Sequence, residues 1–79
     1  MREILRHRRA IAVQRIKLAA AQATYASAIH RRIESGPEWH AFFSHVARRA
    51  SLAARRARAE ITRREEAITA AWVRVHGLD

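Results

Sequence analysis

One short turn segment divides a chain whose other residues favour helix throughout. Residues 35–38, Ser-Gly-Pro-Glu, hold the only Pro and one of the two Gly of the 79 residues, and neither flank shows β-type alternation. Ser35 and Glu38 have the spacing of a capping box, with Pro37 just inside a new helix and Gly36 suited to end the previous one. The sequence therefore predicts an all-α protein with helices over about 2–34 and 38–76 and a turn at 35–37.

So short a connection predicts that the two helices fold back as an antiparallel, coiled-coil-like hairpin, and that residues 1–79 form a single domain. Ala supplies 18 residues, and the larger apolar side chains number only 21. A lone hairpin with so few large side chains buries little apolar surface and is marginally stable. We therefore expect it to associate, as a homodimer forming a bundle or with a partner helix.

The first helix carries an apolar residue at every seventh position. Ile4, Ile11, Leu18 and Tyr25 form this stripe, and Ile29 and Ile33 extend it. Three polar side chains fall on the same face and allow two interpretations: they set the register, or their stems lie along the seam edge with their heads in water. They are Arg8, Arg15 and Gln22. The other flank is rich in small residues that would let a second helix approach closely: Ala12, Ala19, Ala23 and Ala26.

The second helix shows an eleven-residue apolar repeat, which predicts a nearly straight or slightly right-handed helix pair. Its members are Trp39, Ala50, Ile61 and Trp72, together with Val46, Ala57 and Ile68. Antiparallel pairing then places Trp39 against Ile33, Phe43 against Ile29, Val46 against Tyr25, Ala54 against Leu18, Ile61 against Ile11, and Ile68 against Ile4. This register gathers Tyr25, Trp39, Phe42 and Phe43 near the turn. Gly77 is suited to cap the C-terminal end of the second helix.

In this register the second helix outruns the first by about two turns. The overhang leaves apolar side chains without an intramolecular partner, which usually marks an interface. The predicted protein interface consists of Trp72, Val73 and Val75, with Ile68 beside them.

The formal net charge is +9, and the basic residues are fifteen Arg and one Lys. Residues 46–63 read as a helix with methyl groups on one face and guanidinium groups on the other, and no acid lies between Glu38 and Glu60. An acid-free positive face attracts polyanions, and Arg suits phosphate contacts. We predict a nucleic-acid-binding face of Arg48, Arg49, Arg55, Arg56 and Arg63, supported by Arg6 and Arg9.

Three alternatives remain open for this face. A positive face of this kind is also typical of the solvated surface of a coiled coil. It would equally suit an acidic protein as partner. A coding bias toward Arg and Ala would produce the same excess of these two residues with no functional meaning. No helix-turn-helix spacing, zinc ligand set or RNA-binding aromatic motif is present, so binding to the phosphate backbone has more support than base readout. The runner-up function is a helical adaptor or assembly protein that binds a protein partner through its apolar helix ends.

No pattern in the sequence predicts catalysis, a cofactor or a metal site. The chain has no Cys, and five scattered His are interpreted as surface or rim residues: His7, His30, His40, His45 and His76. His40 near the aromatic cluster is the candidate for a core role. Glu60 and Arg64 have the spacing of a helix-stabilising pair and are interpreted as a salt bridge. We expect a non-enzymatic protein.

The sequence also bears on the compartment. The longest charge-free run, 18–29, is too short and polar to span a bilayer, so no membrane partner is expected. The N-terminal residues lack the apolar core and cleavage site of a secretory signal. The basic segment 2–17 could mimic a transit peptide, but its helical pattern continues unbroken into 18–33. A cytoplasmic protein is expected.

Two families share local features with the chain. Arg8-Arg9-x-Ile11-x-Val13 followed by Lys17 resembles the first helix of the small all-helical chorismate mutases, and Pro37-Glu38-x3-Phe42-Phe43 resembles the start of their last helix. That resemblance implies an enzyme whose Arg and Lys side chains bind a dicarboxylate, although the middle helix with its Asp and Arg-Glu motif and the late Gln are missing. The run 55–72 is similar in texture to the coiled-coil stalk of flagellar and type III export ATPases, at about half its usual length.

Overall fold

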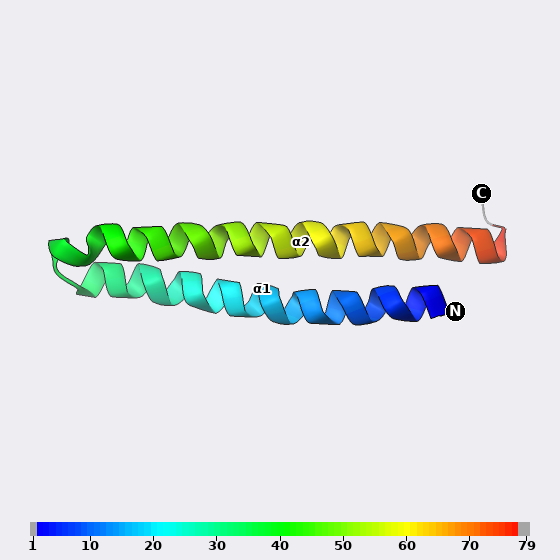
Figure 1. Ribbon diagram of the computed structural model, residues 1–79, viewed down its shortest axis with the longest axis horizontal. Coiled ribbons are helices and arrows are strands. Elements are labelled where there is room, and N and C mark those ends of the chain that lie inside the picture. The colour runs from blue at the N-terminus through cyan, green and yellow to red at the C-terminus, as the bar shows by residue number, and fades with distance from the viewer. Residues whose placement is uncertain (1, 78–79) are drawn as a thin grey trace.

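The computed structural model describes residues 2–77, which form two long helices side by side (Figure 1). Helix α1 spans Arg2–Glu34, a short 3₁₀ turn η1 spans Pro37–Trp39, and helix α2 spans His40–His76. The molecule measures 60 × 18 × 12 Å, and its termini lie at the same end (Figure 1). The predicted all-α antiparallel hairpin is confirmed, and α1 has the predicted bounds.

The turn differs in detail from the predicted capping box. Residues 37–39 form the 3₁₀ turn, α2 begins at His40, and neither η1 nor α2 has a side-chain cap hydrogen bond. The backbone closes the turn instead: the Ser35 N–H donates to the Arg31 carbonyl at 2.8 Å and the Trp39 N–H donates to the Gly36 carbonyl at 3.0 Å. The capping box of Ser35 and Glu38 is therefore wrong, although Pro37 does lie in the first turn of the new segment.

The two glycines play different roles. Gly36 has φ −66° and ψ 166°, the extended region favoured by a residue before Pro, so it does not end α1 in the left-handed conformation. Gly77 has φ 66° and ψ 33°, and its N–H donates to the Val73 carbonyl at 2.7 Å. The predicted C-cap at Gly77 is confirmed, because a left-handed residue there satisfies a terminal carbonyl at little cost for Gly.

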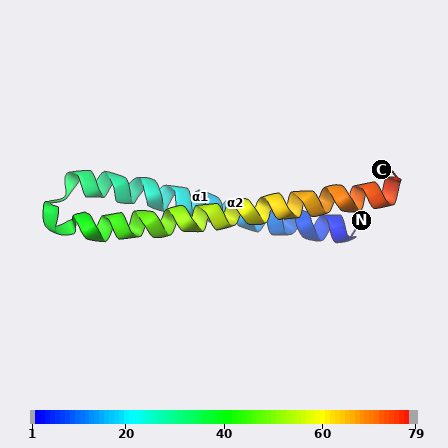
Figure 2. The ribbon, with the colours of Figure 1, turned by 90° about the horizontal axis from the view of Figure 1, so that it is seen from above.

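The seam between the helices follows a seven-residue repeat on both sides. The fully buried side chains are Ile4, Ile11, Ala21 and Ala28 on α1, and Ala47, Ala50, Ala54, Ala57 and Ala71 on α2. Steps of three and four are typical of a coiled coil, and Figure 2 shows the two helices crossing near their middles. The predicted eleven-residue repeat is wrong, because its tryptophans Trp39 and Trp72 lie outside the seam, 52% and 47% exposed.

The α1 stripe also needs correction. The expected Ala flank faces solvent, as do Ile33, Arg8, Arg15 and Gln22, whereas Ala21 and Ala28 are the small residues that α2 covers. Exposure of the three polar side chains agrees with the interpretation that placed their heads in water. The flank residues that are exposed are Ala12, Ala19, Ala23 and Ala26.

Two cross-helix hydrogen bonds near the ends of the hairpin join residues offset from the predicted pairs. Arg74 donates to both carboxylate oxygens of Glu3 at 3.0 and 3.1 Å, whereas the predicted register placed Ile68 at this level. At the other end Arg32 donates to the Ser44 hydroxyl at 3.3 Å. At these two ends the contacts are displaced by a few residues along α2, whereas Arg64, which lies 3.1 Å from His7 Nδ1, agrees with the predicted register.

Three of the four predicted aromatics form the cluster at the turn. The Phe42 ring lies 5.2 Å from Phe43 and 6.0 Å from Trp39, both edge to face. Tyr25 does not join them: it lies beside Ser51 and Ala54, 44% exposed. The cluster is open to solvent, since Trp39 and Phe42 each expose about half of their surface.

Candidate functional site

The predicted arginine face lies on the side of α2 that turns away from the seam. Four of its arginines are exposed: Arg48, Arg49, Arg55 and Arg56. They form two adjacent pairs that lie seven residues apart in the sequence. Seven residues are about two turns, so the pairs lie about 10 Å apart along the helix. The structure thus brings four guanidinium groups onto one stretch of α2.

Ion pairing separates these four arginines from Arg63. Within residues 2–77, no carboxylate lies in salt-bridge range of any of the four. Arg63 instead forms an ion pair with Glu60 although its side chain is 76% exposed. The charge of Arg63 is partly balanced, so its place in the predicted set is weaker than that of the other four.

Glu60 is the centre of a small network at the seam. Arg64 Nε donates to the Glu60 carboxylate at 2.8 Å, which confirms the predicted pair. The Nη1 atom of the same guanidinium group lies 3.1 Å from His7 Nδ1 on α1. His7, expected at the surface or rim, is half-buried at a seam position, whereas His40 is exposed and has no core role. This network joins the two helices away from the turn.

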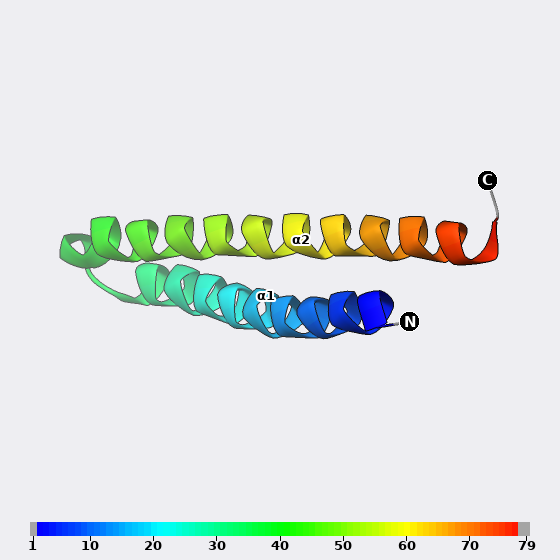
Figure 3. The ribbon, with the colours of Figure 1, turned by 45° about the vertical axis from the view of Figure 1, so that its right-hand side comes forward.

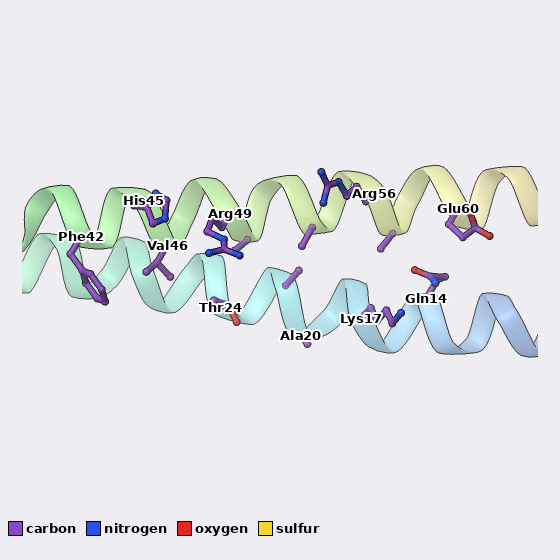
Figure 4. A pocket seen from close by; sticks show the side chains of 14 residues that line it. Gln14, Lys17, Ala20, Thr24, Phe42, His45, Val46, Arg49, Arg56 and Glu60 are labelled. Carbon is purple, nitrogen blue, oxygen red and sulfur yellow. The ribbon is translucent and has the colours of Figure 1, made fainter.

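Arg6 and Arg9 lie apart from the four arginines. Together with Arg2 and Leu5 they line a shallow hollow near the start of α1, at the end where Glu3 meets Arg74. The α1 cation that lines the same groove as Arg49 and Arg56 is Lys17, which lies nearer Arg56 than Arg49 (Figure 4). Lys17 is not in the predicted binding set, and its place beside the arginines depends on how the two helices pack.

A groove of about 950 Å³ runs along one side of the hairpin, between the arginine face and α1 (Figure 4). Small residues from both helices form its floor, including Ala20, Ala50 and Ala53. It continues past Phe42 and Val46 into a second hollow beside Ala28 and Arg31. The labelled groove residues are Gln14, Lys17, Ala20 and Thr24 from α1, and Phe42, His45, Val46, Arg49, Arg56 and Glu60 from α2.

Two smaller hollows lie on the opposite side of the hairpin, and Tyr25 and Ser51 line both. Arg48 and Arg58 border this side, and the Arg32–Ser44 hydrogen bond crosses it. Arg48 and Arg49 thus border opposite sides of α2, although both are exposed.

The end of α2 extends past the start of α1 (Figures 1 and 3), and the predicted apolar interface lies in the last turns of α2. Trp72 and Val75 are 47% and 64% exposed, while Ile68 and Val73 are half-buried. The Trp72 ring packs on His76 at a centroid distance of 3.9 Å. The overhang is shorter than expected because α1 reaches Arg74 through Glu3.

No protein-family model, curated protein or solved structure matches the chain. Neither helix in the described part is long and apolar enough to cross a membrane. The residues behind the resemblance to chorismate mutases do not converge: Arg8 and Lys17 are nine residues apart, about 180° around α1.

Proposed function

We propose that the protein is a small, non-enzymatic interaction protein that binds a polyanion, a nucleic-acid backbone, through the outer face of α2. The observation that carries this proposal is the set of four exposed arginines, Arg48, Arg49, Arg55 and Arg56, which no described carboxylate neutralises. Guanidinium groups bind phosphate oxygens in bidentate fashion. We propose the cytoplasm as the compartment.

Binding of this kind follows charge and depends little on base sequence. The arginines project from one straight helix, and the aromatic rings near the turn pack on one another. The expected complex is therefore sequence-tolerant and salt-sensitive, because each phosphate contact releases counterions.

The non-enzymatic assignment is supported by the state of the groove's acidic residue. Glu60 is the single carboxylate that lines the groove, and both Arg63 and Arg64 hold it. Such an arrangement is typical of a structural ion pair, whereas general acid–base catalysis needs a carboxyl group free to exchange a proton with substrate.

Fluorescence anisotropy with a labelled DNA duplex, titrated at several salt concentrations, tests the proposal. Replacing Arg48, Arg55 and Arg56 by Gln removes three potential phosphate contacts, so the slope of log affinity against log salt should fall by about 2.7. An unchanged affinity and slope would overturn the proposal. Circular dichroism of the variant serves as the folding control.

A second candidate function is a helical adaptor or assembly protein that dimerises through its apolar helix ends. The exposure of Trp72 and Val75 favours it. Trp72→Ala should then abolish a dimer seen by light scattering while leaving the helicity intact. If the wild type is a monomer, or if the variant still dimerises, this candidate fails.

A further inference from the structure

The groove on the side of Lys17, Arg49 and Arg56 has the dimensions of a helix-binding site. It runs from Phe42 to Glu60, eighteen residues apart on α2 and therefore about 27 Å at 1.5 Å per residue. An added helix of about eighteen residues would match that length. Both walls are α-helices, so a third helix would complete a three-helix bundle.

The floor of the groove suits close helix packing. Ala20 of α1 and Ala53 of α2 are exposed on this floor, and buried Ala50 and Ala57 lie beneath them. Small side chains let a helix backbone approach closely, and the larger apolar groups of Phe42 and Val46 provide anchoring surface at one end. Phe42 is 53% exposed, so burial under a partner would remove aromatic surface from water.

The hairpin as a whole exposes more surface than a compact protein of its mass. Its accessible surface is 6264 Å², whereas a compact 9.1 kDa protein exposes about 4,900 Å². The excess of roughly 1,400 Å² exceeds the roughly 800 Å² that one partner contributes to a standard protein interface. The hairpin therefore exposes enough surplus surface for a partner to cover the groove through an interface of standard size.

Charge identifies the occupant. Lys17, Arg49 and Arg56 line the groove, and its one carboxylate, Glu60, already bonds two arginines. A second copy of this chain would bring the same cations into the interface and add another +9 of net charge. A nucleic acid would place phosphates over a methyl-lined floor. A helix with an apolar stripe flanked by carboxylates complements both the floor and the edges.

We propose that this groove binds an acidic amphipathic α-helix of a partner protein. The apolar stripe of that helix packs on the Ala floor and Phe42, and its Asp and Glu side chains pair with Lys17, Arg49 and Arg56. This site shares Arg49 and Arg56 with the proposed phosphate-binding face, but it goes beyond that face because Lys17 and the Ala floor line the groove, whereas Arg48 and Arg55 do not.

The probe is a synthetic eighteen-residue helical peptide with Leu and Ala along one stripe and Glu on both flanks of that stripe. Binding to the full chain is measured by isothermal titration calorimetry. The control peptides carry Lys at the Glu positions, or the same residues in an order that destroys the stripe. We expect saturable one-to-one binding of the acidic amphipathic peptide, and neither control peptide should bind.

Two matched variants locate the site. Arg49→Gln with Arg56→Gln should weaken peptide binding by about tenfold, since it removes two ion pairs of the edge. Arg48→Gln with Arg55→Gln removes the same charge from the same helix and should change peptide binding less than about twofold. Ala53→Gln, which fills the exposed floor, should weaken binding without changing charge, and Ala20→Gln repeats this test from the α1 wall.

Several results would overturn the groove proposal. One is no binding of the acidic peptide, and another is equal binding of a control peptide. Equal loss in the two arginine variants would show general charge attraction. A wild-type dimer that becomes monomeric on Ala53→Gln would assign the groove to a second copy, and loss of DNA binding alone on that change would assign it to nucleic acid. The effect of replacing Arg48 and Arg55 on DNA binding is measured independently of peptide binding, so failure of one proposal can be distinguished from failure of the other.

Discussion

The two halves of the hairpin are built differently. The terminal half, residues 2–16 with 58–77, buries Ile4 and Ile11 and contains the Arg63–Glu60, Arg64–Glu60 and Arg74–Glu3 ion pairs. The turn half, residues 17–34 with 40–57, has a fully buried seam of Ala alone, and none of its arginines has a described carboxylate partner.

This difference shows where stability and binding capacity reside. Large buried side chains and ion pairs stabilise the terminal half. Because its arginines are paired with carboxylates, they are less available to bind an external anion. The Ala seam of the turn half contributes little apolar area, but it leaves the groove open and the arginines of α2 available to an external anion. The predictions below test that division of roles.

The largest effect is expected from Ile11→Ala in the terminal half. Ile11 is 6% exposed, and truncating a buried Ile costs about 2–4 kcal/mol of unfolding free energy. Urea unfolding followed by circular dichroism measures it. Ile16→Ala is the matched control, because Ile16 on the same helix is 71% exposed and should change stability by less than about 0.5 kcal/mol. Equal costs at the two sites would contradict the assigned seam.

The next effect comes from overfilling the turn half. Ala57 is 3% exposed in the close seam, so Ala57→Leu should destabilise the fold by about 1–3 kcal/mol through forced separation of the helices. Ala59→Leu, at an exposed position two residues later, should be within about 0.5 kcal/mol of the wild type. Thermal melts compare the two. A stabilised Ala57→Leu variant would show that the seam has room for larger side chains.

A smaller effect is expected from the ion pairs of the terminal half. The Glu60 side chain is 17% exposed and contacts two arginines, so Glu60→Gln should cost about 1 kcal/mol. The Glu3 side chain is 54% exposed, and Glu3→Gln should cost less than about 0.5 kcal/mol. Denaturant midpoints rank the two variants, and the reverse order would show that Glu60 is not the better buried partner.

The smallest changes in stability are expected from replacing each of the two glycines by Ala. Gly77→Ala places a Cβ at φ +66° and should cost about 0.5–1 kcal/mol. Gly36→Ala has an ordinary φ of −66°, and a new Cβ would meet only the flexible end of Glu38, so stability should stay level or rise slightly. Calorimetric melting temperatures measure both, and a larger loss at position 36 would contradict the described turn.

Much of the fold followed from local patterns. The position of the turn, the bounds of α1, the C-cap at Gly77 and the Glu60–Arg64 pair depend on residues close in sequence, and the structure shows them, although the turn continues through the 3₁₀ segment to Trp39. The capping box failed because Pro37 opens a 3₁₀ turn and holds Gly36 extended, an effect that spacing alone does not reveal.

The seam and the site depend on register, which this sequence specifies weakly. With 18 Ala in the chain, several faces of each helix look equally able to pack, so Ala19 and Ala23 were chosen where the structure buries Ala21 and Ala28. The same ambiguity explains why Arg6 and Arg9, and not Lys17, are predicted to support the α2 arginines. The groove depends on which side chains of the two helices face each other, and the composition of each helix alone does not specify that.

The central claim is that the free arginines of the turn half bind a polyanion, whereas the paired arginines of the terminal half do not. Two variants with the same change in net charge test it by salt-dependent anisotropy of a DNA duplex. Arg48→Gln with Arg55→Gln should lower the salt slope by about 1.8, whereas Arg63→Gln with Arg74→Gln should lower it by less than about half of that amount. Equal losses, or no loss in the first variant, would contradict the claim.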